Sequence, residues 1–243
     1  MASIKATNKS ITQRLTRIEN AIKNRLNTFY KKKIKPLSYL PIEAIRKQYE
    51  SEVKNLIRRT IQEAYLIGTD VVAEKVSDKN NEFIPFISIT DINNIASLAN
   101  KLNDQFWKTA DRLVRREQEF ILNENKELEK KKGFDTEAAI LAFAVSAAYL
   151  PFNNAVISKT KALTIDTTVD LEVGFDILRL EDANLTGRVM FLTREDAKVD
   201  PEICEPLNRT VYDINDPDIP IPIQDTHIHC RCRLIPVVDE SSV

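Results

Sequence analysis

The sequence predicts a mainly α-helical protein, with a helical N-terminal domain of long helices over residues 1–160 and a small C-terminal α+β lobe with short strands over residues 161–243. Apolar residues recur at helical spacing through the first of these ranges. Only four glycines occur in the chain, and six of its ten prolines follow Val199, so turns are concentrated near the end. All three cysteines and both histidines also lie in the last forty residues.

Two apolar stripes predict the first two helices. The first helix is expected between Ser10 and Lys33, because apolar residues recur there at steps of three and four and so share one face. Its stripe comprises Ile11, Leu15, Ile18, Ile22, Leu26 and Phe29. The second helix follows Pro41, and Gly68 marks its end or a kink. Its stripe comprises Ile45, Tyr49, Val53, Leu56, Ile57, Ile61, Ala64 and Tyr65. Both stripes suit a bundle or coiled-coil seam, and we interpret these helices as partner-binding surfaces.

A third helix is predicted from Thr90 or Asp91, either of which can cap the first turn by accepting a hydrogen bond from an unpaired backbone amide. Its apolar stripe adjoins Trp107, which we interpret as a core residue rather than a ligand platform. The pattern continues towards Lys132, and Gly133 stops it.

A fourth helix is predicted from Thr136, which can cap it. Residues 138–150 are apolar on every side. These thirteen residues are fewer than the roughly 20 that cross a bilayer, and Pro151 ends the run. The sequence therefore favours a central buried helix and no membrane contact. The alternative is an interface between copies of the chain, because the small side chains let another helix approach closely.

The charge balance excludes a surface that attracts polyanions everywhere. The 35 basic and 36 acidic side chains give a formal charge of −1, so any contact with nucleic acid has to be local. Two short basic runs lie at residues 31–33 and 130–132. We favour contact with the negative C-terminal end of a helix for both. The alternative is contact with packaged DNA or a neighbouring subunit.

The strongest candidate metal ligands are Cys204, His227, His229, Cys230 and Cys232. In a regular strand, residues two apart share a face, so the last two cysteines point away from the two histidines. Four ligands around one ion therefore need a bend near His229, or Cys204 from another segment, and we favour the second arrangement. Cysteines confined to one lobe indicate a reducing compartment, and the polar N-terminus lacks the apolar core of a signal peptide.

From the residues alone, three interpretations of this cluster stay open. The spacing favours a metal-free turn with buried, hydrogen-bonded thiols, because neither a Cys-x-x-Cys nor a His-x3–5-His pair occurs. A structural zinc ion is the second interpretation. A catalytic ion is the least favoured, because no general base can be named. The common phosphate-loop, nucleophile and zinc-protease motifs are absent, so we expect no enzymatic activity. A nuclease built on Asp216, Asp218 and His227 is a further, disfavoured arrangement.

The segment from Leu185 to Val237 carries a distinctive order of features. It comprises a strand at 188–193, an acidic turn at 194–200, Cys204 and Leu207, residues 210–213, Pro222 to His227, the run Cys230, Arg231 and Cys232, and an aliphatic strand at 233–236. This order resembles the C-terminal domain of the phage Mu F-type head morphogenesis proteins, the minor capsid proteins of tailed viruses. In that family a Cys-x-x-Cys-x-x-Leu-x-Gly segment precedes a Pro-x-His-x-x-Cys-Arg-Cys ending. The resemblance covers about a fifth of the chain.

The resemblance implies a structural zinc site. Its ligands would be Cys204, His227, Cys230 and Cys232, with His229 as the substitute ligand. Two positions depart from the family pattern. Pro201 stands where the family has its first cysteine, and the glycine after the leucine is replaced near Arg209. One thiolate is therefore missing unless a histidine takes its place.

The resemblance also implies a function. We expect a minor head protein of a tailed virus or a related provirus, located in the capsid interior or at the portal vertex and assembled in the host cytoplasm. Portal and major capsid proteins would be its partners, with a second copy of the chain and packaged DNA as further candidates. A competing hypothesis is a nucleic-acid-binding protein with a zinc-ribbon-like lobe, in which Arg231, Arg233 and the lysine runs contact phosphates. The neutral net charge argues against it.

Overall fold

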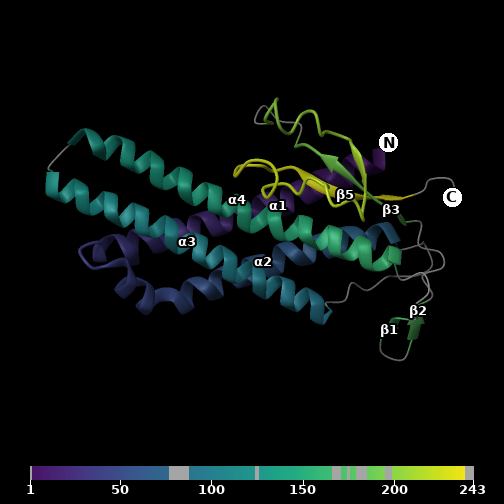
Figure 1. Cartoon of the computed structure of the whole chain (residues 1–243), viewed down its shortest axis with the longest axis horizontal. Helices are drawn as coiled ribbons and strands as arrows, with labels where there is room; N and C mark the ends of the chain where they lie inside the picture. The colour runs from purple at the N-terminus through teal and green to yellow at the C-terminus, as the bar shows by residue number, and fades with distance from the viewer. Residues whose placement is uncertain are drawn as a thin grey trace. The chain divides into compact units, whose positions relative to one another are not determined.

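The computed structural model describes residues 2–76, 88–123, 126–165, 171–173, 176–178, 185–194 and 199–238. Within these residues the predicted class is confirmed, because four long α-helices precede a small antiparallel sheet (Figure 1). The helices are α1 (Ala2–Phe29), α2 (Ile42–Val76), α3 (Ile89–Asn123) and α4 (Lys126–Ile165). The strands are β1 (Leu171–Val173), β2 (Asp176–Leu178), β3 (Leu185–Leu192), β4 (Val211–Asp213) and β5 (Arg233–Val238).

The chain divides into two compact units. Unit 1 comprises residues 1–63 and 93–148, and unit 2 comprises residues 64–92 and 149–243. Three helices, α2, α3 and α4, contribute residues to both units. These units are not the ranges that the sequence suggested, because the end of α4 groups with the C-terminal lobe. The division into 1–160 and 161–243 concerned functional domains and stays a prediction.

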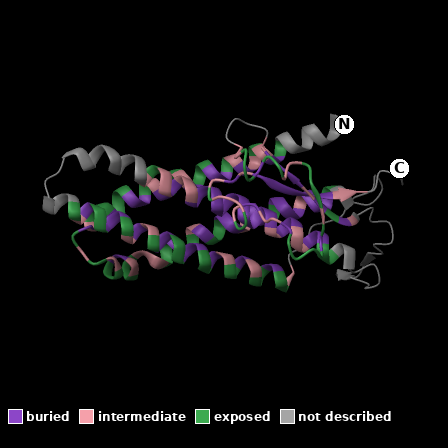
Figure 2. Ribbon diagram, turned by 45° about the horizontal axis from the view of Figure 1, so that its top comes forward, coloured by how far each residue is buried: buried purple, intermediate pink, exposed green. Residues whose placement is uncertain are grey.

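The core of unit 1 is built from the predicted apolar stripes. All six stripe residues of α1 are at most 8% exposed, and buried residues follow the inner faces of the helices (Figure 2). Phe29 packs edge to face against Tyr49 and Phe106, with 5.6 and 6.5 Å between ring centroids. Trp107 is 2% exposed, which confirms it as a core residue. These stripes are therefore largely covered within the chain, with Tyr49 and Leu56 half-buried, and the role of these helices as partner-binding surfaces stays a prediction.

The end of α1 departs from regular helix. A π-helical turn, η1 (Tyr30–Ile34), follows α1 and leads into a 3-10 turn, η2 (Lys35–Leu37). A π-helical turn holds more residues than an α-helical one, and such turns are often found at functional sites. Tyr30 and Ile34 are buried, while the three lysines between them are all exposed. The turn therefore presents three consecutive cations on one exposed segment.

Gly68 lies inside α2, not at its end, because the helix continues to Val76. This glycine allows α4 to pack closely against α2. A Cβ atom at residue 68 would lie 2.5 Å from the carbonyl oxygen of Phe152 and 2.7 Å from Cβ of Ala155. Real Cβ atoms do not approach other atoms so closely, so a glycine permits the contact between these two helices.

The helix α4 passes through three residues that were predicted to bound helices. Thr136 lies inside the helix instead of capping its start, and both Gly133 and Pro151 fall within its bounds. Proline in a helix interior costs about 3 kcal/mol, because it removes a backbone hydrogen bond. Here residues 143–150 are all buried, and the burial of this apolar segment offsets that cost. The predicted central buried helix is confirmed, but its predicted ends are wrong.

The continuation of α4 through Pro151 also removes the length argument against a membrane span. Among the described residues, Thr136–Ala162 form one helix that is long and apolar enough to cross a membrane by length and composition, with a mean hydropathy of 1.6. However, 78% of the apolar window is buried inside the structure. Such burial is typical of a core helix.

A reciprocal cap begins α3. The backbone N–H and the hydroxyl of Ser88 both donate to Oδ2 of Asp91 at 2.7 Å, and the backbone N–H of Asp91 donates to Oγ of Ser88 at 3.2 Å. This is a capping box in which an aspartate takes the usual place of glutamate. The capping residue is therefore Ser88 and not Thr90. Asp91 also accepts hydrogen bonds from Tyr65, at 2.6 Å, and from Lys159.

The sheet of unit 2 has the strand order β4-β3-β5, with both pairings antiparallel. Val189 of the central strand β3 pairs with Tyr212 on one side and Pro236 on the other. The pairing of β3 with β5 is irregular between Leu185 and Val189, where Gly187 has a φ of 68°. Glycine adopts this backbone conformation readily because it has no Cβ atom. A separate antiparallel pair is formed by β1 and β2.

Candidate metal centre

The sheet brings three cysteines together from two segments. Cys204 lies in the turn that joins β3 to β4, whereas Cys230 and Cys232 directly precede β5. Because β3 pairs with both neighbouring strands, the turn that follows β3 meets the segment that enters β5. The pairing of Leu192 with Arg233 marks this junction. The register of the strands therefore positions all three thiols at one end of the sheet.

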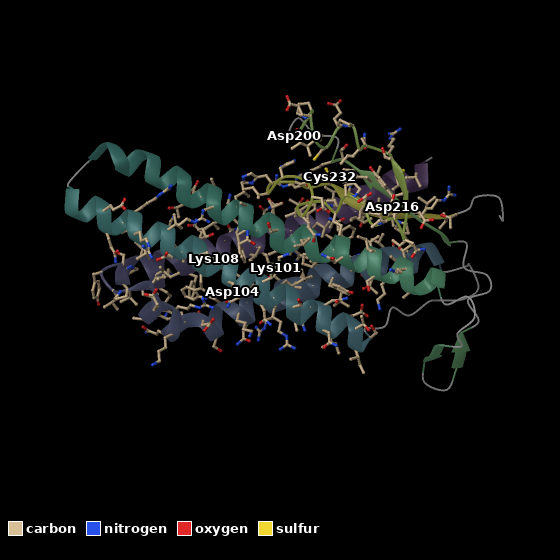
Figure 3. The ribbon with its side chains drawn as sticks, viewed as in Figure 1. Lys101, Asp104, Lys108, Asp200, Asp216 and Cys232 are labelled. Carbon is tan, nitrogen blue, oxygen red and sulfur yellow. The ribbon has the colours of Figure 1, made fainter. Side chains whose placement is uncertain are left out.

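Asp200 shapes the turn that carries Cys204. Its carboxylate accepts hydrogen bonds from the backbone N–H groups of Glu202 and Ile203, at 3.0 and 2.9 Å. Its backbone carbonyl accepts a third from the N–H of Cys204, at 3.0 Å. Aspartate commonly closes tight turns in this way, because its short side chain reaches backbone groups two residues ahead. Figure 3 labels Asp200 and Cys232 on the two segments.

Asn153 of α4 holds the segment that carries Cys232. Its side-chain oxygen accepts a hydrogen bond from the backbone N–H of Leu234 at 2.8 Å, and its side-chain nitrogen donates to the carbonyl of Cys232 at 3.4 Å. The amide thus binds β5 as a neighbouring strand would. Asn153 is fully buried, and a buried amide without such partners would be costly. This contact fixes the backbone of Cys232.

The three sulfur atoms have the spacing of a metal ligand set. They lie within 4.8 Å of one another, and the Sγ atoms of Cys204 and Cys230 are 3.7 Å apart. Two thiolates bound tetrahedrally to zinc at about 2.3 Å are themselves about 3.8 Å apart. All three cysteines are free thiols and are buried. They lie close together and could bind a metal.

Both histidines lie beside this cluster without joining it. His227 and His229 line a small cavity of about 10 Å³ together with Cys204, Cys232 and Arg231. Among the described residues, the group of ligand atoms within 4.8 Å of one another contains the three cysteines and neither histidine. Of the five sequence-predicted ligands, the structure therefore brings three together and places the other two on the adjoining cavity wall.

The thiols differ in acidity because they share hydrogen bonds. Donation from the Cys232 thiol, and then from the Thr226 hydroxyl, lowers the pKa of Cys230 to about 5 although burial opposes this. Burial raises the pKa of Cys204 to about 12. The hydrogen bond that Cys232 donates raises its own pKa as well. The shared hydrogen bonds thus favour the thiolate form at Cys230 over the other two cysteines, and a cation beside the cluster would favour further thiolates.

The aspartates of the following loops close turns, as the sequence predicts. Asp213, Asp216 and Asp225 each accept a hydrogen bond at 2.8–2.9 Å from a backbone N–H two or four residues away. Within the described part of the chain, none of them belongs to a group of potential metal ligands. This arrangement gives no support to a nuclease site built on Asp216.

In comparison with known proteins, no family model matches this sequence, and neither the curated proteins nor the solved structures give a match.

Proposed function

We propose that the protein is a minor head protein of a tailed virus or provirus, and that its C-terminal lobe is a docking module held together by a metal ion. The observation that carries this proposal is the meeting of Cys204 with Cys230 and Cys232 at one end of the sheet. These are the residues through which the segment resembles the Mu F-type head proteins. Their meeting supports the proposal, because three of the four expected ligands come together.

The backbone at Arg209 supports the same proposal. Near this position the family pattern has a glycine, and Arg209 has a φ of 63°. Residues other than glycine rarely adopt a positive φ, because Cβ then crowds the backbone. The turn after Leu207 thus has the conformation that a glycine would favour, although the residue is an arginine.

We assign zinc to the site, with His227 as the fourth ligand. Thiolates and imidazole are the ligands that zinc takes at structural sites, and four ligands complete its tetrahedral shell. Pro201, which stands at the position of the missing cysteine, is exposed and has no side-chain ligand atom. A histidine therefore has to supply the fourth ligand. His227 occupies the family position and lines the cavity beside Cys204 and Cys232.

The zinc assignment predicts about one equivalent of zinc in the purified protein, measured by mass spectrometry of the metal. A chelator should unfold the lobe, because the energy of metal binding is part of its folding energy. Cys204→Ser should produce the same loss, and His227→Ala should weaken zinc binding. His229→Ala is the matched control and should retain the metal. Metal-free protein whose unfolding is insensitive to chelator would contradict the assignment.

The assembly role predicts that the protein copurifies with portal or major capsid protein from producing cells. Tagged wild-type chain and Cys204→Ser should be compared at equal expression, because loss of the lobe removes the docking module. The wild type should sediment with heads, and the variant should be depleted from them at least several-fold. Recovery of the wild type solely as a free monomer would be decisive against the role, whatever the metal content.

A further inference from the structure

The overall charge of −1 conceals a strong asymmetry along the chain. Residues 1–41 contain ten basic residues and one acidic residue, whereas residues 42–243 contain 25 basic and 35 acidic ones. The ten are Lys5, Lys9, Arg14, Arg17, Lys23, Arg25, Lys31, Lys32, Lys33 and Lys35. The single acidic residue, Glu19, is 4% exposed. Within residues 10–41, the exposed charges are therefore all positive.

Exposed cations recur along α1, η1 and η2, and we call this set the basic face. The exposed cations are Arg17, Arg25, Lys31, Lys32, Lys33 and Lys35. The face extends over about 27 Å at a rise of 1.5 Å per residue. The π-helical turn adds to the density of charge, because it exposes three consecutive lysines between buried neighbours.

A groove in unit 1 runs beside this face. Its volume is about 620 Å³, and it is bounded by residues of α1 and η1 on one side and of α2 on the other. Four cations line it, namely Arg25, Lys32, Lys33 and Arg59, against one carboxylate, Glu52. The uncharged lining residues are Asn24, Thr28, Phe29, Asn55 and Leu56. Guanidinium and ammonium groups around hydrogen-bonding side chains suit a ligand that carries several phosphates.

We propose that this basic face and its groove bind the phosphodiester backbone of a nucleic acid. A basic stripe along one helix is the electrostatic feature by which such proteins contact phosphates. An anionic membrane fits less well, because membrane-binding helices expose large apolar side chains beside their cations. The apolar stripe of α1 is instead buried, with Leu15 and Leu26 both fully covered. The contact is with phosphates and carries no base specificity.

The test uses the full chain and two triple variants. Arg25→Gln, Lys32→Gln and Arg59→Gln together remove three cations of the groove. The control combines Lys47→Gln, Lys101→Gln and Lys108→Gln, which removes the same charge from exposed positions on α2 and α3 (Figure 3). All six side chains are exposed, so both variants should fold. Circular dichroism confirms this before binding is measured.

Binding to a fluorescent 30-nucleotide single strand and a 30-base-pair duplex is followed by anisotropy at several NaCl concentrations. For the duplex, the slope of log K against log salt should fall by about 0.9 for each phosphate that the protein no longer neutralises, or about 2.7 in the groove variant. Affinity should fall at least tenfold at 0.1 M salt in the groove variant, and little in the control. An equal weakening of binding in the two variants would overturn the proposal.

Two further probes separate nucleic acid from other polyanions. Vesicles containing phosphatidylserine should bind more weakly than the duplex at equal anionic charge, and polyglutamate should compete poorly. If the vesicles bind as tightly as the duplex with the same dependence on the groove cations, the ligand is a membrane and the proposal fails. If polyglutamate displaces the duplex at equal charge, the site is a general anion surface and the proposal also fails.

Discussion

Asp91 is the most deeply buried carboxylate among the described residues, at 1% exposure. Burial acts to raise its pKa, but the hydrogen bonds from Lys159, Tyr65 and Ser88 outweigh burial and hold the pKa below the ordinary value of 3.8. Folding therefore favours the ionised carboxylate. Its contribution to stability is complete above pH 3.8 and is lost as the pH falls through the lower pKa of the folded state.

Asp91→Asn is expected to lower the free energy of unfolding by about 3–5 kcal/mol at pH 7, because it removes the charge of the carboxylate that pairs with the buried ammonium of Lys159. Urea unfolding at pH 7 and at steps below pH 3.8 measures the effect. The difference between wild type and variant should shrink as the wild-type carboxylate becomes protonated. Asp104→Asn, which removes an exposed partner of Arg46, should change stability by less than about 1 kcal/mol. A difference that stays constant to pH 2 would contradict this account.

The residues of the candidate site could be predicted only in part. The three cysteines stand out because they are the only ones in the sequence. Their meeting follows from the pairing of β3 with β5, which brings the turn that carries Cys204 next to the segment that carries Cys230 and Cys232. Asn153 gave no such signal, although an amide within an apolar helix has to find buried partners. Its partners are the carbonyl of Tyr149 one turn earlier in α4 and backbone groups of Cys232 and Leu234. No sequence pattern identifies the two distant ones. His227 was expected at the ion, with His229 as its substitute, but the structure places both in the lining of the adjoining cavity and outside the group of three thiols.

At the scale of elements, apolar spacing predicted the helices well, whereas the residues thought to break them were misleading. The spacing of apolar residues shows which face of a helix is buried. It carries no information about where the helix begins or ends. Gly133, Thr136 and Pro151 have weak local preferences of up to about 3 kcal/mol. Around Pro151, burial of the apolar side chains outweighs a preference of this size. Gly68 is the opposite case, because this glycine permits the close approach of α4 and does not break α2.

Gly68→Ala tests this contact between α2 and α4. Alanine normally stabilises a helix relative to glycine by up to about 1 kcal/mol. Here the added methyl group meets a carbonyl oxygen at 2.5 Å, so we expect a destabilisation of about 1–3 kcal/mol from overpacking. Thermal unfolding measures the change. Ser51→Ala, at an exposed position of the same helix, is the control and should stabilise slightly. A gain in stability at residue 68 would mean that the two helices lie further apart.

For the whole molecule, the mainly helical class followed from the sequence, but the distribution of charge did not follow from the net value. A total near zero arises here from a basic first helix and a more acidic remainder. Counting charge by element reveals the basic face. The groove beside it depends on how α1 and α2 pack in unit 1, and helical spacing does not report packing between helices. The charge of the candidate binding surface could therefore be predicted from the sequence, whereas the location of the groove required the tertiary structure.

The hydrogen bonds of Asn153 also impose an order on synthesis. Two partners of this amide lie 79 and 81 residues later in the chain. When α4 emerges from the ribosome, the side-chain nitrogen can already donate to the carbonyl of Tyr149, but the side-chain oxygen has yet to meet the backbone N–H of Leu234. The strand β5 arrives last and supplies both partners at once. The thiols at 230 and 232 reach Cys204 in the same event. Closure of the sheet, pairing of the amide and gathering of the sulfurs are therefore one folding step, which a ribosome-bound chain that ends before β5 cannot take.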